Sequence, residues 1–235
     1  MIEVVKSNER GLTNIDWLES YHSFSFGEFY DESKIHFGPL RVLNDDTIQP
    51  GMGFPKHPHS DMEIVTIVTQ GELAHEDSEG NRGVIGTNEI QRMTAGHGIF
   101  HSEFNNSQTE VLKLYQIWIL PNQKGLQPEY QQIAYSHEDG KNKLNMVVSG
   151  TQADNVIFIN QDVDIYLSDL ELQKEIKFNI RDGRGIYIHV VDGELQVGSN
   201  LLSPGDAAMV SKESEIIIKS NSASRFILFD VTLNF

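Results

Sequence analysis

Cysteine is absent from the 235 residues of this chain. The absence excludes disulfide bonds, thiolate metal sites and cysteine nucleophiles, so histidine and carboxylate side chains are the ligands that the protein can offer a metal. Basic residues are also scarce, because 18 Lys and Arg stand against 34 Asp and Glu and leave a formal net charge of −16. A phosphate backbone would be repelled over most of such a surface, and we expect no direct binding of nucleic acid.

Long apolar runs are missing as well. No segment approaches the roughly 18 consecutive apolar residues that a membrane span needs, and the chain turns polar within its first ten residues. We therefore expect no membrane insertion and a soluble, cytoplasmic protein. Hydrophobic residues still make up 39% of the chain, which is enough for a packed core, and the length allows one large all-β domain or two of ordinary size.

The sequence does contain many short β-rich runs separated by Gly, Asn and Asp. The segment 112–120, LKLYQIWIL, is too apolar for one face to be exposed, which predicts a strand in a closed or sandwiched sheet. Trp118 within it, like Trp17, is expected in the core rather than at a substrate site. No segment has a strong helix pattern over more than about 12 residues. The pattern predicts an all-β protein, with residues 121–145 as a connection between two domains.

Two short motifs carry residues suited to chemistry. His57 and His59 are separated by one residue in GMGFPKHPHSDME. His101 and Glu103 repeat that spacing in GHGIFHSEFN. Side chains at positions i and i+2 of a strand share a face, so the members of each pair project together. Two such pairs on neighbouring strands predict a four-ligand metal site, and Asn105 is expected to point into the same interior.

The other histidines are interpreted differently, because a lone buried histidine is more often satisfied by a hydrogen bond than bound to a metal. These histidines are His22, His36, His75, His97, His137 and His189. His97 lies between two glycines just before the second motif and is expected to serve a loop.

The second half of the chain repeats the order of the first. GEL at 71–73 recurs at 193–195, in each case after an apolar strand and before a second turn. Aligning the halves on these turns, and on Glu89 with Asp206, identifies the residues that replace the four candidate ligands. The replacements are Asn179, Arg181, Ile218 and Ser220. We therefore expect two similar β-barrels, the first carrying a metal and the second without ligands.

The spacing of the motifs resembles that of known metal-binding barrels. The segment 51–71 resembles the first motif of the cupin superfamily, and the segment 96–105 resembles the second. Together with SFSF at 23–26, AHED at 74–77 and TAGHGIFHSE at 94–103, they resemble the pirin family of bicupins.

This resemblance implies an all-β bicupin, that is, two stacked antiparallel β-barrels of the jelly-roll or cupin type. We expect residues 1–130 to form a metal-binding cupin domain and residues 131–235 a degenerate cupin domain that lacks metal ligands. In several pirins the implied activity is cleavage of the central ring of a flavonol such as quercetin. In nuclear pirins the implied role is that of a cofactor of transcription regulators, exerted through protein contacts.

The carboxylate ligand has two candidates. Pirins resemble one another in taking it from the second motif, here Glu103, whereas many other cupins use the first-motif glutamate, here Glu63. We assign Glu103 as the ligand and place Glu63 in the barrel wall or beside the ligands. The predicted ligand set is therefore His57, His59, His101 and Glu103. One divalent transition metal is expected, with Fe(II) preferred and Mn, Co, Ni, Cu or Zn as alternatives.

Four ligands leave one or two coordination positions open for a substrate. A flavonol could bind there through its deprotonated hydroxyl, with the metal acting as Lewis acid and with O2 as the second substrate. Glu103 is the expected catalytic base for that hydroxyl proton. A monomer would suffice, because both barrels belong to one chain. The alternative is a non-enzymatic metal-binding pirin module whose metal or redox state regulates a protein partner.

Overall fold

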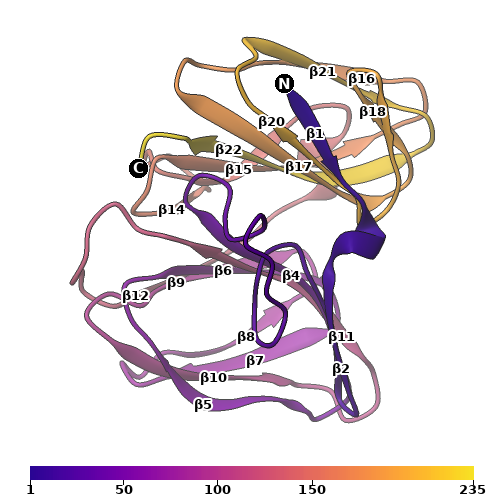
Figure 1. The fold of residues 1–235 in the computed structure, drawn as a ribbon. Coiled ribbons are helices and arrows are strands. Elements are labelled where there is room, and N and C mark those ends of the chain that lie inside the picture. The colour runs from indigo at the N-terminus through magenta and orange to yellow at the C-terminus, as the bar shows by residue number, and fades with distance from the viewer.

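The computed structural model describes all 235 residues, which form two stacked β-barrels (Figure 1). In the lower barrel of Figure 1, a seven-stranded sheet of order β12-β9-β6-β11-β4-β3-β2 faces a four-stranded sheet of order β5-β10-β7-β8. Its strands are β2 (Gly11–Ile15), β3 (Leu18–His22), β4 (Leu40–Ile48), β5 (Gly53–His59), β6 (Glu63–Gln70), β7 (Glu72–Asp77), β8 (Arg82–Gly86), β9 (Glu89–Thr94), β10 (Ile99–Asn105), β11 (Leu112–Ile119) and β12 (Glu129–Ala134).

The upper barrel repeats this plan with a seven-stranded sheet, β1-β20-β17-β22-β15-β13-β14, and a four-stranded sheet, β16-β21-β18-β19. Its strands are β1 (Ile2–Val5), β13 (Asn145–Ser149), β14 (Ile157–Phe158), β15 (Val163–Leu170), β16 (Glu175–Asn179), β17 (Arg184–Asp192), β18 (Leu195–Val197), β19 (Asn200–Leu202), β20 (Ala207–Val210), β21 (Glu215–Ser220) and β22 (Ser224–Thr232). Two single 3-10 turns, Ser7–Glu9 and His137–Gly140, are the helical segments, and neither has the length or apolar character to cross a bilayer. The predicted all-β bicupin fold is confirmed.

The barrels stack through their seven-stranded sheets. Alternation along β6 directs Val65 and Ile67 toward the other barrel, and Ile64 and Thr66 into its own barrel. The shared core of 21 buried residues also includes Phe229 of β22. β11, predicted to lie in a sandwiched sheet, is buried over most of its length for the same reason. Both sheets therefore have two covered faces, and the two barrels share one apolar core.

The interior of the second barrel is filled with apolar side chains. Ile188 and Ile218 are fully buried there, and Ile218 occupies the position equivalent to His101 in the sequence repeat. The turns that define the repeat also match, because Gly71 (φ +81°) and Gly193 (φ +76°) adopt the same left-handed conformation after β6 and β17. The two halves thus share a chain path but differ in what fills the barrel.

Two strands cross between the halves of the chain. β1 pairs with β20 of the second barrel, and β12 pairs with β9 of the first. The division expected at residues 130 and 131 therefore falls inside β12, and the segment 121–145 contains a strand instead of only a connection. Pairing covers the edges of β9 and β20, which would otherwise present unpaired N–H and C=O groups. The polar composition of β12, EYQQIA, gave little sign of this strand.

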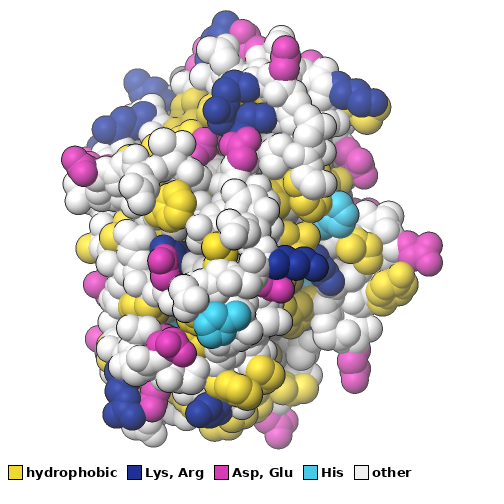
Figure 2. All heavy atoms as spheres, turned by 90° about the vertical axis from the view of Figure 1, so that its left-hand side faces the viewer, with side chains coloured by type: hydrophobic (Ala, Val, Ile, Leu, Met, Phe, Trp, Pro, Cys, Tyr) yellow, Lys and Arg dark blue, Asp and Glu magenta, His cyan; other side chains and the backbone are white.

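Charged side chains of both signs are intermixed on the face of the molecule drawn in Figure 2. Several surface cations are paired, as in Arg82 with Glu76 (2.7 Å) and Lys177 with Glu215 (2.6 Å). On this face the negative excess of the chain is dispersed rather than gathered into one patch.

Candidate metal centre

β5 and β10 bring the three predicted histidine ligands together. The strands pair with His101 directly opposite His57, and His59 lies two residues further along β5, on the same face. The ring centroids are 4.4 Å apart for His57 and His101, 4.8 Å for His57 and His59, and 4.9 Å for His59 and His101. One nitrogen of each ring lies within 4.8 Å of the others, so the three imidazoles converge on a space that one ion would fill.

A bulge separates the two predicted ligand pairs. Glu103 pairs with Phe54 whereas His101 pairs with His57, so β5 has one residue more than β10 in this interval. The interval contains Pro55, whose missing N–H is tolerated where the ladder is already interrupted. Its carbonyl accepts a hydrogen bond from Nδ1 of His57 (2.8 Å). Since Nδ1 carries the proton, Nε2 of the neutral ring keeps its lone pair for a metal.

Glu103 is buried beside His101 and is held by amides of the facing sheet. Nε2 of Gln91 donates to its Oε1 (2.8 Å), and Nε2 of Gln116 donates to its Oε2 (2.8 Å). The ligand atoms of Glu103, His101 and His75 lie within 4.8 Å of one another and form a second group. Glu103 is not part of the first group, which consists of the three predicted histidine ligands. All four predicted ligands nevertheless line the same cavity.

Burial holds two of the imidazoles, those of His59 and His101, in the neutral form that metals bind. Burial, reinforced by the rings of His101 and His57, lowers the pKa of His59 to about 4. Burial, reinforced by His57 and His75, lowers the pKa of His101 to about 3. Both ring nitrogens of His101 are buried without a hydrogen-bond partner, which is costly unless another group uses them. These orphaned nitrogens and the imidazole and carboxylate donors fit a divalent transition metal.

Glu63 faces away from this group. Its buried carboxylate accepts hydrogen bonds from the hydroxyl of Thr94 (3.0 Å) and from Nδ2 of Asn160 (2.9 Å), a residue of the second half of the chain. Nε of Arg92 lies 4.0 Å from Oε2 of Glu63. β5 and β6 belong to different sheets, so the face shared by residues of one strand does not extend from the histidines to Glu63. Glu63 lies in the barrel wall and is directed toward the other barrel.

The remaining histidines are of two kinds. Four have the expected hydrogen bonds: His22 with Asn44, His36 with the carbonyl of Gly38, His97 with Gln127, and His137 with Asp169. The expectation is wrong for His75 and His189, whose ring nitrogens are buried without partners. For His75 the nearest carboxylate, that of Asp77, is 3.6 Å away. His75 lies opposite Glu103 on β7. The i, i+2 spacing of His75 and Asp77 in AHED indicates that these two side chains share a face of the strand.

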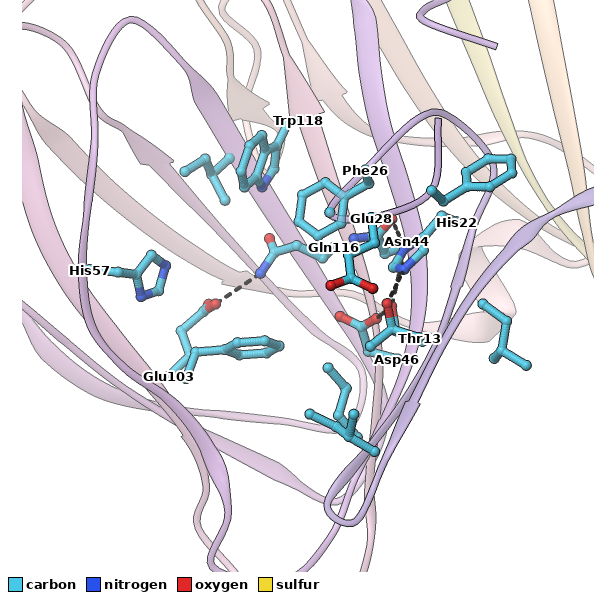
Figure 3. A pocket seen from close by; sticks show the side chains of 18 of the residues that line it. Thr13, His22, Phe26, Glu28, Asn44, Asp46, His57, Glu103, Gln116 and Trp118 are labelled. Atoms are coloured by element: carbon cyan, nitrogen blue, oxygen red, sulfur yellow. Dashed lines mark hydrogen bonds between the residues drawn. The ribbon is translucent and has the colours of Figure 1, made fainter. Parts of the chain in front are cut away.

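The ligands open onto a cavity of about 570 Å³ in the first barrel (Figure 3). Trp118 lines this cavity, and its ring is edge-on to the rings of His59 and Phe26. The distances between ring centroids are 4.9 Å to His59 and 5.4 Å to Phe26. Trp118 was expected in the core, but alternation on β11 turns it toward the barrel interior, together with Gln116. Asn105 does not line the cavity, because its amide donates to backbone carbonyls of β4 and of the loop after β10. The aromatic rings of Trp118 and Phe26 therefore provide a surface next to the histidines against which a planar aromatic molecule would pack.

Two stacked barrels with converging imidazoles in only the first define the class of this protein: a bicupin with one metal-binding barrel. Two family models match the chain, one described as Pirin over residues 4–119 and one described as Quercetinase C-terminal cupin domain over residues 146–231. The Quercetin 2,3-dioxygenase of Escherichia coli strain K12 is 41% identical over 231 residues, which cover 98% of this chain and 99% of that protein. This chain belongs to the pirin family.

Solved structures agree with this assignment. The bacterial pirin YhhW from Escherichia coli, in complex with nickel(II), has a TM-score of 0.94 at 39% identity, and the match covers 99% of each chain. A Quercetin 2,3-dioxygenase from Acinetobacter baumannii has a TM-score of 0.81 at 23% identity, covering 99% of this chain and 86% of that one. The similarity to the Acinetobacter baumannii protein concerns the fold alone. The similarity to YhhW extends over sequence and structure.

Proposed function

We propose that this chain is a metal-dependent dioxygenase that cleaves the central ring of flavonols such as quercetin with O2. The observation that carries the proposal is the convergence of three imidazoles at an aromatic-lined cavity. The volume of about 570 Å³ falls within the range of small-molecule sites, roughly 300–1,000 Å³. The Escherichia coli relative of nearly equal length is named Quercetin 2,3-dioxygenase, which supports the same substrate class.

One divalent transition metal is the proposed cofactor, with Fe(II) preferred and Mn, Co, Ni, Cu or Zn compatible with the same donors. Its proposed ligands are His57, His59, His101 and Glu103. Each oxygen of Glu103 has two lone pairs, so a bond to the metal can coexist with the amide donors of Gln91 and Gln116. When bound, the metal would polarise the flavonol oxygens as a Lewis acid.

The side chains of the cavity would bind and orient the substrate. Phe26 and Trp118 offer aromatic contacts to a planar flavonol, which add to the gain from buried apolar area. Glu103 is the proposed acceptor for the proton of the hydroxyl that meets the metal, because it lies beside His101 at the cavity wall. One chain would suffice, since both ligand pairs come from the same barrel.

Removing one imidazole tests this proposal. We expect His57→Ala and His101→Ala each to lower metal affinity at least about tenfold and to abolish quercetin cleavage. Metal content by elemental analysis, and O2 consumption with quercetin after loading Fe(II), Mn(II), Co(II), Ni(II) or Cu(II) in turn, measure the two effects. His97→Ala is the matched control, because His97 lies on an exposed loop.

The two readouts separate the possible outcomes. If no metal supports turnover above that of the two variants, the enzymatic proposal fails for this substrate. Metal binding that depends on His57 and His101 without any turnover would favour a non-enzymatic metal-binding module.

A further inference from the structure

A second polar group lies across the cavity from the histidines. β3 and β4 pair with Ser20 opposite Asp46 and with His22 opposite Asn44. All four side chains are buried and line the cavity. Figure 3 shows Asp46 and Asn44 on the side of the cavity opposite His57. We call these four residues the far-wall cluster.

Asp46 has one carboxyl oxygen that no other residue of the protein uses as a hydrogen-bond acceptor. Nδ1 of His22 donates to Oδ1 of Asn44 (2.9 Å), and Nε2 of His22 accepts from the hydroxyl of Thr13 (2.9 Å). The hydroxyl of Ser20 donates to Oδ1 of Asp46. No other side chain or backbone group of the protein donates to the Asp46 carboxyl, so Oδ2 is available to a molecule in the cavity.

The charges around the cavity restrict what that molecule can be. No Lys or Arg lines it, whereas Glu28, Asp46 and Glu103 do. Burial raises the pKa of Asp46 to about 7, with the Ser20 hydrogen bond acting against this rise and the charges of Asp45 and Glu103 adding to it. An acidic wall without cations disfavours a carboxylate or phosphate on the ligand and favours hydrogen-bond donors.

We propose that Asp46, oriented by Ser20, accepts a hydrogen bond from a substrate hydroxyl at the end remote from the metal ligands. This inference rests on the proposed function and narrows its substrate class to uncharged planar aromatics with hydroxyls at both ends. The histidine side of the cavity selects oxygens that bind a metal, and the free oxygen of Asp46 selects an O–H donor. Asp46 is thereby a specificity-determining residue, since a flavonol without distal hydroxyls leaves its carboxylate unpaired.

Two flavonols distinguish the contributions of the two ends of the cavity to substrate binding. Quercetin and 3-hydroxyflavone both carry the hydroxyl and carbonyl that would face the metal, but only quercetin has hydroxyls on its other rings. We expect Asp46→Asn to raise the dissociation constant of quercetin about tenfold at pH 8 and that of 3-hydroxyflavone less than about twofold. Tryptophan fluorescence of nickel(II)-loaded protein, titrated without O2, measures both constants. The pH keeps Asp46 mostly ionised in the wild type.

Two further variants guard against a structural effect. Glu19→Gln is the matched control, because Glu19 is exposed on β3, lies outside the cavity lining and should change neither constant. Ser20→Ala keeps the Asp46 carboxyl but removes its orienting donor, and should weaken quercetin binding about threefold. An unchanged quercetin constant in Asp46→Asn, or equal losses for both flavonols, would overturn the proposal.

A probe that does not chelate a metal distinguishes this inference from the proposed function. Resorcinol presents two separated hydroxyls, and saturation-transfer NMR on metal-free protein reports its binding. If resorcinol binds the wild type and this binding is lost in Asp46→Asn, the proposed role of Asp46 is supported. If neither flavonol binds the wild type in the same experiments, that result counts against the flavonol function but not against the role of Asp46. The far-wall inference is overturned if quercetin binding does not depend on Asp46 and resorcinol either fails to bind the wild type or binds wild type and Asp46→Asn equally.

Discussion

The proposed ligands are oriented by groups that hold their other polar atoms. His57 is fixed by the Pro55 carbonyl on Nδ1, and Glu103 has one amide donor on each oxygen. Such contacts set the tautomer of an imidazole and the direction of a carboxylate, and their loss lowers metal affinity about 10–100-fold in metalloproteins generally. Gln91 and Gln116 therefore belong to the site as much as the ligands do, although neither lies in a recognisable motif.

Gln116→Leu tests this role. We expect the affinity for a divalent metal to fall about tenfold, because one oxygen of Glu103 loses the amide donor that orients it. Metal titration against a competing chelator measures the change. Gln123→Leu, in an exposed loop, is the matched control. Equal affinities in the two variants would show that Gln116 does not position the carboxylate.

At the level of secondary structure, the site depends on how closely β5 approaches β10. A Cβ placed on Gly53 would collide with the carbonyl oxygen of Glu103 and would lie 2.5 Å from Cα of Phe104. Backbone atoms in a paired strand cannot move aside separately, so the absence of a side chain at this position permits the approach. The bulge that follows then sets the offset between His57 and Glu103.

Gly53→Ala should push the two strands apart. We expect it to lower the free energy of unfolding by about 1–3 kcal/mol and to weaken metal binding, because the ligands of β5 shift relative to those of β10. Urea denaturation and metal titration provide the two measurements. Gly86→Ala on β8 is the control, since its nearest neighbour, Oε2 of Glu89, would be at an ordinary 3.4 Å. Similar values for both variants would contradict the role given to Gly53.

On the scale of the whole molecule, stacking of the barrels encloses a titratable residue. His189 of β17 is fully buried, with its ring 5.3 Å from that of Tyr115 on β11. Burial lowers the pKa of His189 to about 3, whereas an unfolded histidine titrates near 6.5. The unfolded chain therefore binds more protons than the folded one between these two values. The stability that neutral His189 allows is complete above about pH 6.5 and is lost as the pH falls toward 3.

Acid should thus weaken the interface between the barrels. Below about pH 6, we expect His189 alone to contribute a loss of up to about 1.4 kcal/mol in unfolding free energy per pH unit. His189→Gln, which does not titrate, should flatten this slope even where it lowers stability at pH 7. Urea denaturation of metal-free protein at pH 7, 6, 5 and 4 measures the slope, with exposed His36→Gln as control. Identical slopes for wild type and His189→Gln would refute this account.

The all-β class, the two-barrel repeat and the candidate donor residues could all be predicted from the amino-acid sequence. These are local properties, because alternation along a strand, the residues of a turn and the chemistry of imidazole and carboxylate are all readable within a few positions. The pairing of His57 with His59 on one face followed from the same period of two, and β5 confirms that shared face.

The face of each strand that meets the cavity could not be predicted from the sequence and is known from the folded arrangement of the sheets. Glu63 is directed toward the second barrel, Trp118 and Asp46 toward the cavity, and β1 and β12 each complete a sheet in the opposite half of the chain. The physical reason is that parity along a strand is known from neighbouring residues, whereas sheet membership depends on pairing between segments far apart in the chain. A single bulge or an exchanged strand changes that pairing without leaving a local mark in the sequence.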